Sequence, residues 1–179
     1  VLVWPGVYQE EITFHGKAIT VRSAADAAVI TAPSGYACSF YTGEDGGSVL
    51  ANFVIMGCLD AGVFCSSASP TLKNLTIVGN TVGVKAYEGS DPNIINCIVW
   101  DNRDSDLYQC NARYSNVRKI GTLAAMPGNI STDPRFADPQ NGDYHLKSRA
   151  GRYVPSLDIW VTDAVTSPCI DAGDPREEP

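Results

Sequence analysis

Residues 72–80 read LKNLTIVGN, and closely similar phrases stand 22 residues earlier and 22 residues later. The earlier copy is LANFVIMGC at 50–58, and the later copy is IINCIVWDN at 94–102. Periods of about 20–50 residues are typical of solenoids and other repeat architectures. The spacing therefore predicts a chain built from stacked, nearly identical units.

One asparagine recurs in each unit, as Asn52, Asn74 and Asn96. A looser fourth copy is predicted at 113–120, RYSNVRKI, where Asn116 takes the equivalent place. In a stack of units these side chains would lie one above another, and each amide would hydrogen-bond to the next. We therefore predict that the repeated asparagines form a structural ladder at a bend of the chain.

The residues around these positions follow the pattern of short β-strands. Val, Ile, Thr and aromatic residues alternate with polar ones over short runs, which are bounded by Gly, Asn, Asp and Ser. No stretch keeps hydrophobic residues at the 3.6-residue spacing of a helix. A unit of this length with two or three strands fits one turn of a parallel β-solenoid, whose turns stack about 4.8 Å apart.

Several segments resemble a known group of proteins. The stretch 5–23, PGVYQEEITFHGKAITVRS, resembles the first rung of right-handed parallel β-helix proteins of the pectin-lyase-like superfamily. The phrases NLTIVGN at 74–80 and NCIVWDN at 96–102 are similar to their internal repeat. The tail, DPRFADPQNGDYHL at 133–146 and SPCIDAGDP at 167–175, is similar to the closing segment of large secreted bacterial β-helix repeat proteins of unassigned activity.

Together the repeat and the resemblance predict an all-β, right-handed parallel β-helix of about five to six rungs. Residues 1–121 would form the rungs, and residues 122–179 would wrap or cap them as part of the same domain. The resemblance also implies an extracellular or cell-surface location. It implies little about function, because this architecture carries lyases, hydrolases, esterases, adhesins and inert stalks.

Composition excludes some classes of partner. The chain of 179 residues has a formal net charge of −7 and no run of Lys or Arg, which argues against nucleic acid. No segment has the length and hydrophobicity of a membrane span. Six cysteines without a CxxC pair permit up to three disulfides and fit an oxidising compartment. Alternatively several are small buried hydrophobic residues, which is the interpretation favoured for Cys97.

The densest polar cluster is DNRDSD at 101–106. Related enzymes bring carboxylates, with an Arg or Lys base or a calcium ion, together from neighbouring rungs. Asp101, Arg103, Asp104 and Asp106 are therefore the candidate catalytic residues, and the three aspartates are the candidate calcium ligands. The alternative is a solvated turn whose side chains bond to their own backbone. His15 and His145 have no evident partner in the sequence, so no catalytic triad is predicted, and no cofactor is expected apart from this calcium candidate.

The strands that follow the asparagine-containing strands form a second candidate surface. Side chains alternate between the two faces of a strand, so the sequence predicts which of them face outward. If Val63, Val84 and Leu107 point into the coil, their neighbours point to solvent. The outward set forms an aromatic row with one lysine, a surface on which sugar rings stack, and it comprises Tyr41, Phe64, Lys85, Tyr87 and Tyr108. The alternative is an aromatic row that only stabilises the sheet.

The outward positions of the asparagine-containing strands are hydrophobic and include Met56, Val78 and Trp100. Such a face should be covered, either by IWVTDAV at 159–165 or by a neighbouring subunit. Open ends of a β-helix also expose unpaired strand edges, which permits end-to-end self-association into filaments. The sequence thus favours a non-catalytic extracellular module, structural or filament-forming and in contact with carbohydrate. The alternative is a polysaccharide lyase or glycoside hydrolase acting on an acidic polysaccharide.

Overall fold

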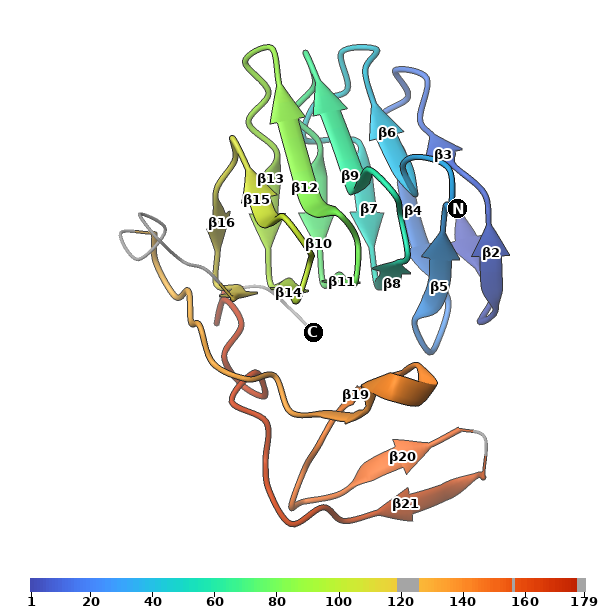
Figure 1. Ribbon diagram of the computed structural model, residues 1–179, viewed down its shortest axis with the longest axis vertical. Coiled ribbons are helices and arrows are strands. Elements are labelled where there is room, and N and C mark those ends of the chain that lie inside the picture. Colours follow the sequence, from blue (N-terminus) through green and yellow to red (C-terminus); the bar gives the residue numbers. More distant parts are fainter. Residues whose placement is uncertain (119–125, 156, 177–179) are drawn as a thin grey trace.

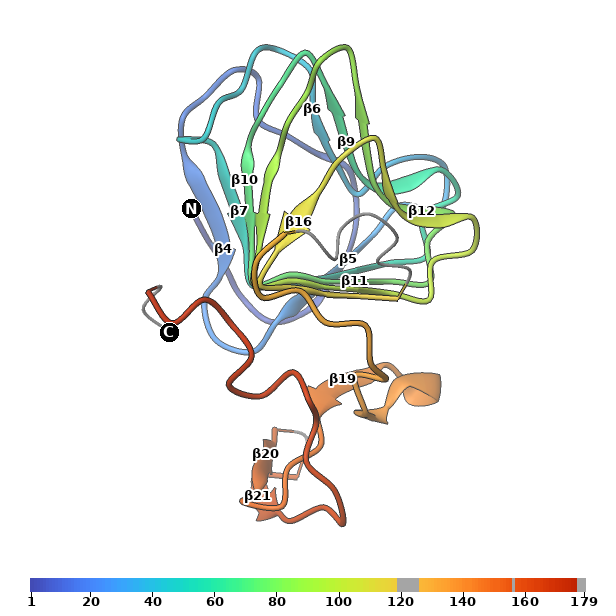
Figure 2. The same cartoon turned by 90° about the vertical axis from the view of Figure 1, so that its left-hand side faces the viewer.

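The computed structural model describes residues 1–118, 126–155 and 157–176. Parallel strands wind through these residues into a β-helix of about five turns, which confirms the predicted fold class. Figure 1 shows successive turns side by side, from the N-terminal end to the last turn, with the C-terminal residues below them. Figure 2 looks along the coil and shows the three sheets around its axis. The side chains that point inward form the main hydrophobic core.

Successive turns of the coil contribute strands to three parallel sheets, named A, B and C here, and the last turn has described strands in sheets A and B only. Sheet A contains β1 (Leu2–Val3), β4 (Thr20–Ser23), β7 (Val49–Ala51), β10 (Thr71–Lys73), β13 (Asn93–Ile95) and β16 (Ala112–Arg113). Sheet B contains β2 (Val7–Gln9), β5 (Ala28–Thr31), β8 (Phe53–Met56), β11 (Thr76–Val78), β14 (Ile98–Trp100) and β17 (Asn116–Val117). Sheet C contains β3 (Ile12–Thr13), β6 (Cys38–Phe40), β9 (Ala61–Ser66), β12 (Val82–Tyr87) and β15 (Ser105–Tyr108).

The 22-residue period is one turn of the coil, because equivalent hydrophobic residues are direct strand partners. Leu50, Leu72 and Ile94 pair in sheet A, and all three are at most 1% exposed. Ile55 and Ile77 pair in the same way in sheet B and are fully buried. Burying side chains of this size contributes about 1.5–3 kcal/mol each. The repeat therefore encodes the core.

Turns of unequal length nevertheless stay in register. Val21 pairs with Leu50, although the chain between them is longer than the chain between Leu50 and Leu72. The extra residues lie at the corners between sheets and include 41–48, which connect β6 to β7. Sheet pairing is therefore independent of corner length.

The repeated asparagines occupy the bend between sheets A and B. Asn52, Asn74 and Asn96 have φ values of 61°, 54° and 54°. Asparagine adopts this left-handed conformation more readily than most residues. Among the described residues no side-chain hydrogen bond joins these three, and the side-chain oxygen of Asn96 accepts the Asp174 amide at 2.8 Å. The predicted bonds from each amide to the next therefore do not form among these three residues, and their repetition is explained by backbone conformation.

The fourth turn is shorter than the predicted alignment. Ser115 Oγ accepts the Cys97 amide 18 residues earlier in the chain, and Tyr114 has the left-handed φ of 48° that marks the bend. Asn116 instead lies within β17, opposite Ile98. The alignment of Asn116 with the repeated asparagines was therefore wrong, because four residues are missing from this turn.

Amide-to-amide bonding occurs at the corner between sheets B and C. The Nδ2 of Asn80 donates to Oδ1 of Asn102 at 3.0 Å, and both residues are buried. Asn80 Oδ1 accepts the Cys58 amide at 3.0 Å, and Asn102 Nδ2 donates to Asp106 Oδ1 at 2.9 Å. These bonds satisfy polar groups that the corner would otherwise bury unpaired.

The residues after the coil form an arm that lies beneath sheet B, coloured orange to red in Figure 1. It consists of the short antiparallel pair β18 (Phe136–Asp138) and β19 (Asp143–Leu146), joined by η2 (Pro139–Asn141), and of a second hairpin, β20 (Arg152–Val154) and β21 (Ile159–Val161). The predicted boundary between 121 and 122 lies outside the described residues.

The arm covers the hydrophobic outer face of sheet B. Phe136 packs with Val54 and Val78, and the surrounding cluster also contains Met56, Trp100, Tyr144 and Leu146. Within 159–165, the segment expected to cover this face, residues 159–161 pair instead in the outer hairpin, where Trp160 is 74% exposed, whereas Val165 lines a cavity with Val78 and Trp100. Phe136 is the better cover because its strand directly adjoins sheet B. Self-association through this face would have to displace the chain's own arm.

All six cysteines are free thiols, so none of the three disulfides that the sequence permits is formed. Four of them, including Cys97, are fully buried and act as small hydrophobic residues, as expected for Cys97. Burial raises the pKa of Cys97 to about 12, which keeps the thiol unreactive. Within the described residues, no helix is long and hydrophobic enough to cross a membrane.

Candidate functional site

Four aromatic rings form a continuous row along sheet C. Tyr36 stacks on Phe64 with a centroid distance of 4.5 Å and an interplanar angle of 14°. Phe64 contacts Tyr87 at 6.1 Å, and Tyr87 contacts Tyr108 at 5.4 Å, both with tilted rings. Such pairs contribute about 0.5–1.5 kcal/mol each beyond their buried area. The row therefore stabilises the stack of turns and also presents aromatic surface to solvent.

Alternation within the strands positions this row. Val63 and Val84 are fully buried, and Leu107 packs against the same core, as the sequence predicts. Their neighbours Phe64, Lys85 and Tyr108 are register partners on the outer face. Tyr36 was missed because it lies in the connection before β6, outside the repeated phrase.

Lys85 provides the charge beside the row. Its Nζ lies 2.8 Å from Asp60 Oδ1 and 5.6 Å from the centre of the Tyr87 ring. The hydrogen bond between Lys85 and Asp60 raises the pKa of Lys85 and lowers that of Asp60. The neighbouring Tyr36 hydroxyl also lowers the pKa of Asp60. The polar groups beside the rings are thus held in fixed positions.

Tyr41, the remaining member of the predicted row, lies apart from these ring contacts. It follows Phe40, the partner of Cys65, and so lies beside Ser66, which in turn pairs with Tyr87. Its side chain is 49% exposed. Tyr41 therefore lies two turns from Tyr87, with Ser66 between them.

The structure separates the charged residues of 101–106. Asp101 forms an ion pair with Arg118, whereas Arg103 pairs with Asp104 at 3.2 Å in solvent. Asp106 is buried and accepts the Asn102 amide groups. No cluster of three or more His, Cys, Asp or Glu residues that could hold a metal ion occurs in the described part of the chain. Of the four candidate catalytic residues, Arg103 and Asp104 thus contact each other, whereas Asp101 and Asp106 have separate partners.

Two cavities lie between the outer face of sheet B and the arm. One has a volume of about 590 Å³ and is lined by residues including Asp26, Asn52, Asn74 and His145. The other has a volume of about 900 Å³ and is lined by residues including Trp100, Arg135, Tyr144 and Lys147. Tyr144 lines both cavities, so its side chain marks the boundary between them.

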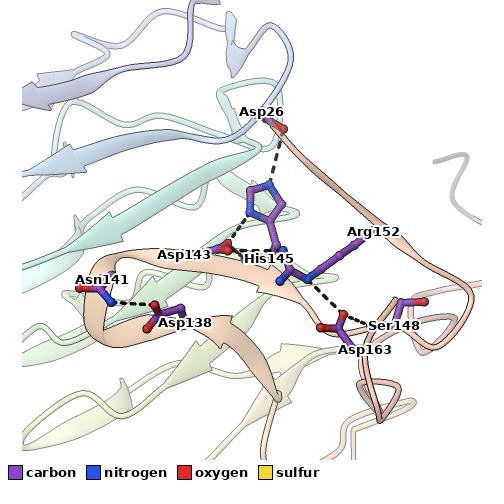
Figure 3. Close-up of polar contacts among 8 residues, drawn as sticks. All are labelled: Asp26, Asp138, Asn141, Asp143, His145, Ser148, Arg152 and Asp163. Carbon is purple, nitrogen blue, oxygen red and sulfur yellow. Dashed lines mark hydrogen bonds and ion pairs between the residues drawn. The ribbon is translucent and has the colours of Figure 1, made fainter. Parts of the chain in front are cut away.

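A polar cluster joins the arm to the coil at the smaller cavity, as Figure 3 shows. His145 Nδ1 lies 2.5 Å from Asp143 Oδ1, and His145 Nε2 lies 3.6 Å from Asp26 Oδ1 in the corner between β4 and β5. Arg152 lies between two carboxylates, 3.5 Å from Asp143 Oδ2 and 3.1 Å from Asp163 Oδ2. The interpretation that His145 lacks a partner was therefore wrong.

The distances in this cluster favour a role in attaching the arm to the coil over a role in cleaving a glycosidic bond. An acid and a base that cleave a glycosidic bond must flank a sugar ring, and their carboxylates stand about 5–9.5 Å apart. The two ring nitrogens of His145 contact Asp143 and Asp26, so the imidazole occupies the space between these carboxylates that a sugar ring would need. The cluster instead links β19 to the coil and to β20.

Fold and surface together define a parallel β-helix protein with an aromatic outer face and a C-terminal arm that encloses a groove. The chain belongs to the disaggregatase-related family, whose model matches residues 48–173. No curated protein and no solved structure matches the chain significantly. The matched stretch contains the whole lining of the larger cavity, whereas Tyr36 and Asp26 precede it.

Proposed function

We propose that this chain is a non-catalytic, extracellular β-helix module that contacts carbohydrate through the aromatic row of sheet C. The observation that carries the proposal is the row itself, with four rings in contact and Tyr108 at its end still 38% exposed. Sugars bind to such surfaces by placing their C–H faces against aromatic rings and their hydroxyls against fixed polar groups.

The arrangement of polar groups supports this assignment. Lys85 and Asp60 are fixed against each other beside the rings, so they offer a donor and an acceptor at little entropic cost. Ser66 and Ser67 both donate to Glu88 Oε2, at 2.6 and 3.1 Å, next to the same strands. A ligand that lies along the coil would meet rings and polar groups in alternation.

Membership of the disaggregatase-related family suggests what carbohydrate binding would be for. A rigid coil that holds a polysaccharide would place it beside a partner that disperses aggregates. The alternative, a lyase or glycoside hydrolase with its groups at 101–106, has less support, because Asp101 and Asp106 have separate partners. New reducing or unsaturated ends on an acidic polysaccharide, abolished by Arg103→Ala, would favour that alternative.

The proposal is tested by native gel electrophoresis in gels that contain polygalacturonate, alginate, xylan or galactomannan. The wild-type chain is expected to be retarded by at least one of them. Tyr87→Ala combined with Tyr108→Ala should reduce the retardation at least about fivefold, because each change removes a stacking face.

Tyr153→Ala is the matched control, since Tyr153 is also 38% exposed but lies on the outer hairpin. Its mobility should equal that of the wild-type chain. The proposal fails if no polysaccharide retards the protein. It also fails if the control loses as much retardation as the double variant.

A further inference from the structure

The larger cavity beneath sheet B contains two cations at paired positions. Phe136 and Leu146 are antiparallel partners in β18 and β19, and the next residues outward are Arg135 and Lys147. The Lys147 amide donates to the Arg135 carbonyl at 3.1 Å, which fixes the two residues opposite each other. Like charges at directly opposed positions repel each other and destabilise the pairing.

Neither cation has a counter-ion in the described part of the chain. No ion pair or side-chain hydrogen bond joins Arg135 or Lys147 to a described residue, whereas the cavity's carboxylates all have donors. Asp101 pairs with Arg118, Asp133 accepts the Arg135 amide at 2.9 Å, and Asp138 accepts from Asn141 at 2.7 Å. Arg135 is exposed and Lys147 is half-buried, so two positive side chains without partners in this part of the chain border a cavity of about 900 Å³.

The backbone beneath these cations is held rigidly. Ser167 is 2% exposed, its hydroxyl donates to the Pro134 carbonyl at 2.6 Å, and its amide donates to the Lys147 carbonyl at 2.8 Å. This single residue ties the backbone next to Arg135 to that of Lys147. A ligand would thus meet cations attached to an ordered frame, which lowers the entropic cost of binding.

The remaining lining defines the ligand. Trp100 and Tyr144 supply aromatic surface within the same cavity, and the volume lies in the range of about 300–1,000 Å³ usual for small-molecule sites. A guanidinium matches a carboxylate with two parallel hydrogen bonds. Each of the three lining aspartates already has a donor, so the two cations are left for one carboxylate of the ligand.

We propose that this cavity is a binding site for an acidic sugar, whose carboxylate lies between Arg135 and Lys147 and whose ring lies against Trp100 and Tyr144. The site is separate from the aromatic row of sheet C. It deepens the proposed function, on which it rests for the class of ligand, by adding a second contact with selectivity for charge.

The test is calorimetric titration of the whole chain with trigalacturonate and with its neutral counterpart, galactotriose. The wild-type protein should bind trigalacturonate at least about tenfold more tightly, because only the acid engages the two cations. Arg135→Gln combined with Lys147→Gln should abolish that preference and leave galactotriose binding unchanged. Arg135→Lys keeps the charge but loses the paired hydrogen bonds, so it should weaken trigalacturonate binding about threefold to fivefold.

Lys17→Gln combined with Arg22→Gln is the control, because it also removes two positive charges, from exposed positions on the coil. This control should bind trigalacturonate within about twofold of the wild-type chain, since screening weakens distant charges. Equal affinity of the wild-type chain for the two sugars would overturn the inference, and so would an equal loss in the control. If the glutamine double variant unfolds, the Arg135→Lys titration decides.

Failure of this inference is distinguishable from failure of the proposed function. The variant lacking Tyr87 and Tyr108 rings should lose retardation by polysaccharide but keep its preference for trigalacturonate. If it keeps retardation and the charge preference remains, only the assignment of the aromatic row is wrong. If the preference is absent while retardation depends on the rings, only the acidic-sugar site is wrong.

Discussion

The side chains of Asn80 and Asn102 are joined by a hydrogen bond of 3.0 Å between two successive turns of the coil. Asn80 also donates to the Ile55 carbonyl at 3.1 Å and accepts the Cys58 amide at 3.0 Å. One amide thus links three consecutive turns, because its partners lie on the turn before it and on the turn after it. The corner between sheets B and C is fixed by this network, whereas the corner between sheets A and B depends on backbone conformation.

Asn80→Leu should lower the free energy of unfolding by about 3 kcal/mol, because each buried group left unpaired costs about 1–3 kcal/mol. Denaturant titration monitored by circular dichroism measures the change. Asn141→Leu, at an exposed position with a single side-chain bond to Asp138, should cost less than about 1 kcal/mol. Equal costs for the two variants would contradict a structural role for the buried amide.

At the other corner, Asn74→Gly should leave stability within about 0.5 kcal/mol of the wild-type value, whereas Asn74→Ala should cost about 1–2 kcal/mol. Glycine accepts the φ of 54° found at this position, and alanine does not accept it without strain. The same denaturant titration distinguishes the two. If glycine proved as damaging as alanine, the amide and not the conformation would matter here.

The attachment of the arm depends on Phe136, which is 8% exposed against sheet B. Phe136→Ala should therefore cost about 3 kcal/mol or more. Hydrogen exchange should accelerate most in β19 and in the outward residues of β8 and β11. Ile159→Ala is the control, because Ile159 is 45% exposed, and it should change neither stability nor exchange. An unchanged exchange rate in β19 after Phe136→Ala would exclude this mode of attachment.

Acid should weaken the closing segment. The hydrogen bonds from Arg176 lower the pKa of Asp174 to about 2, below the value of about 3.9 for an unfolded aspartate. A carboxyl whose pKa is lowered by folding stabilises the native state above the unfolded pKa, and this contribution is lost as the pH falls through the folded pKa. The wild-type chain should therefore exceed Asp174→Asn in stability at pH 6, and the difference should vanish between about pH 4 and pH 2. A difference that is independent of pH would contradict this account.

The sequence was sufficient to predict the coil because the residues that repeat every 22 positions are also the residues that contact each other. Leu50 and Leu72 lie 22 residues apart and are direct partners, so pattern and contact coincide. The prediction was wrong where a turn changed length: Asn116 kept the residue type of the bend, but Tyr114 occupies it. Aligning turns by one residue type alone does not reveal that a turn has lost residues.

The candidate sites were less accessible to sequence reasoning. Alternation predicted the outward positions of Phe64, Lys85 and Tyr108, because strand geometry fixes them locally. The partnership of His145 with Asp26 spans most of the chain and depends on how a non-repeating arm folds back. The pairing of Arg135 with Lys147 depends likewise on a hairpin that has no counterpart in the repeat.

The unequal turns of the coil have a consequence for how such a chain can change. Val21 meets Leu50 in register despite the longer connection between them, so neighbouring strands are insensitive to what the corner contains. A segment inserted after β6 would protrude without shifting any sheet. The architecture thus separates the part that must repeat from the part that is free to diversify, and new recognition loops can be added to the corners while the core stays the same.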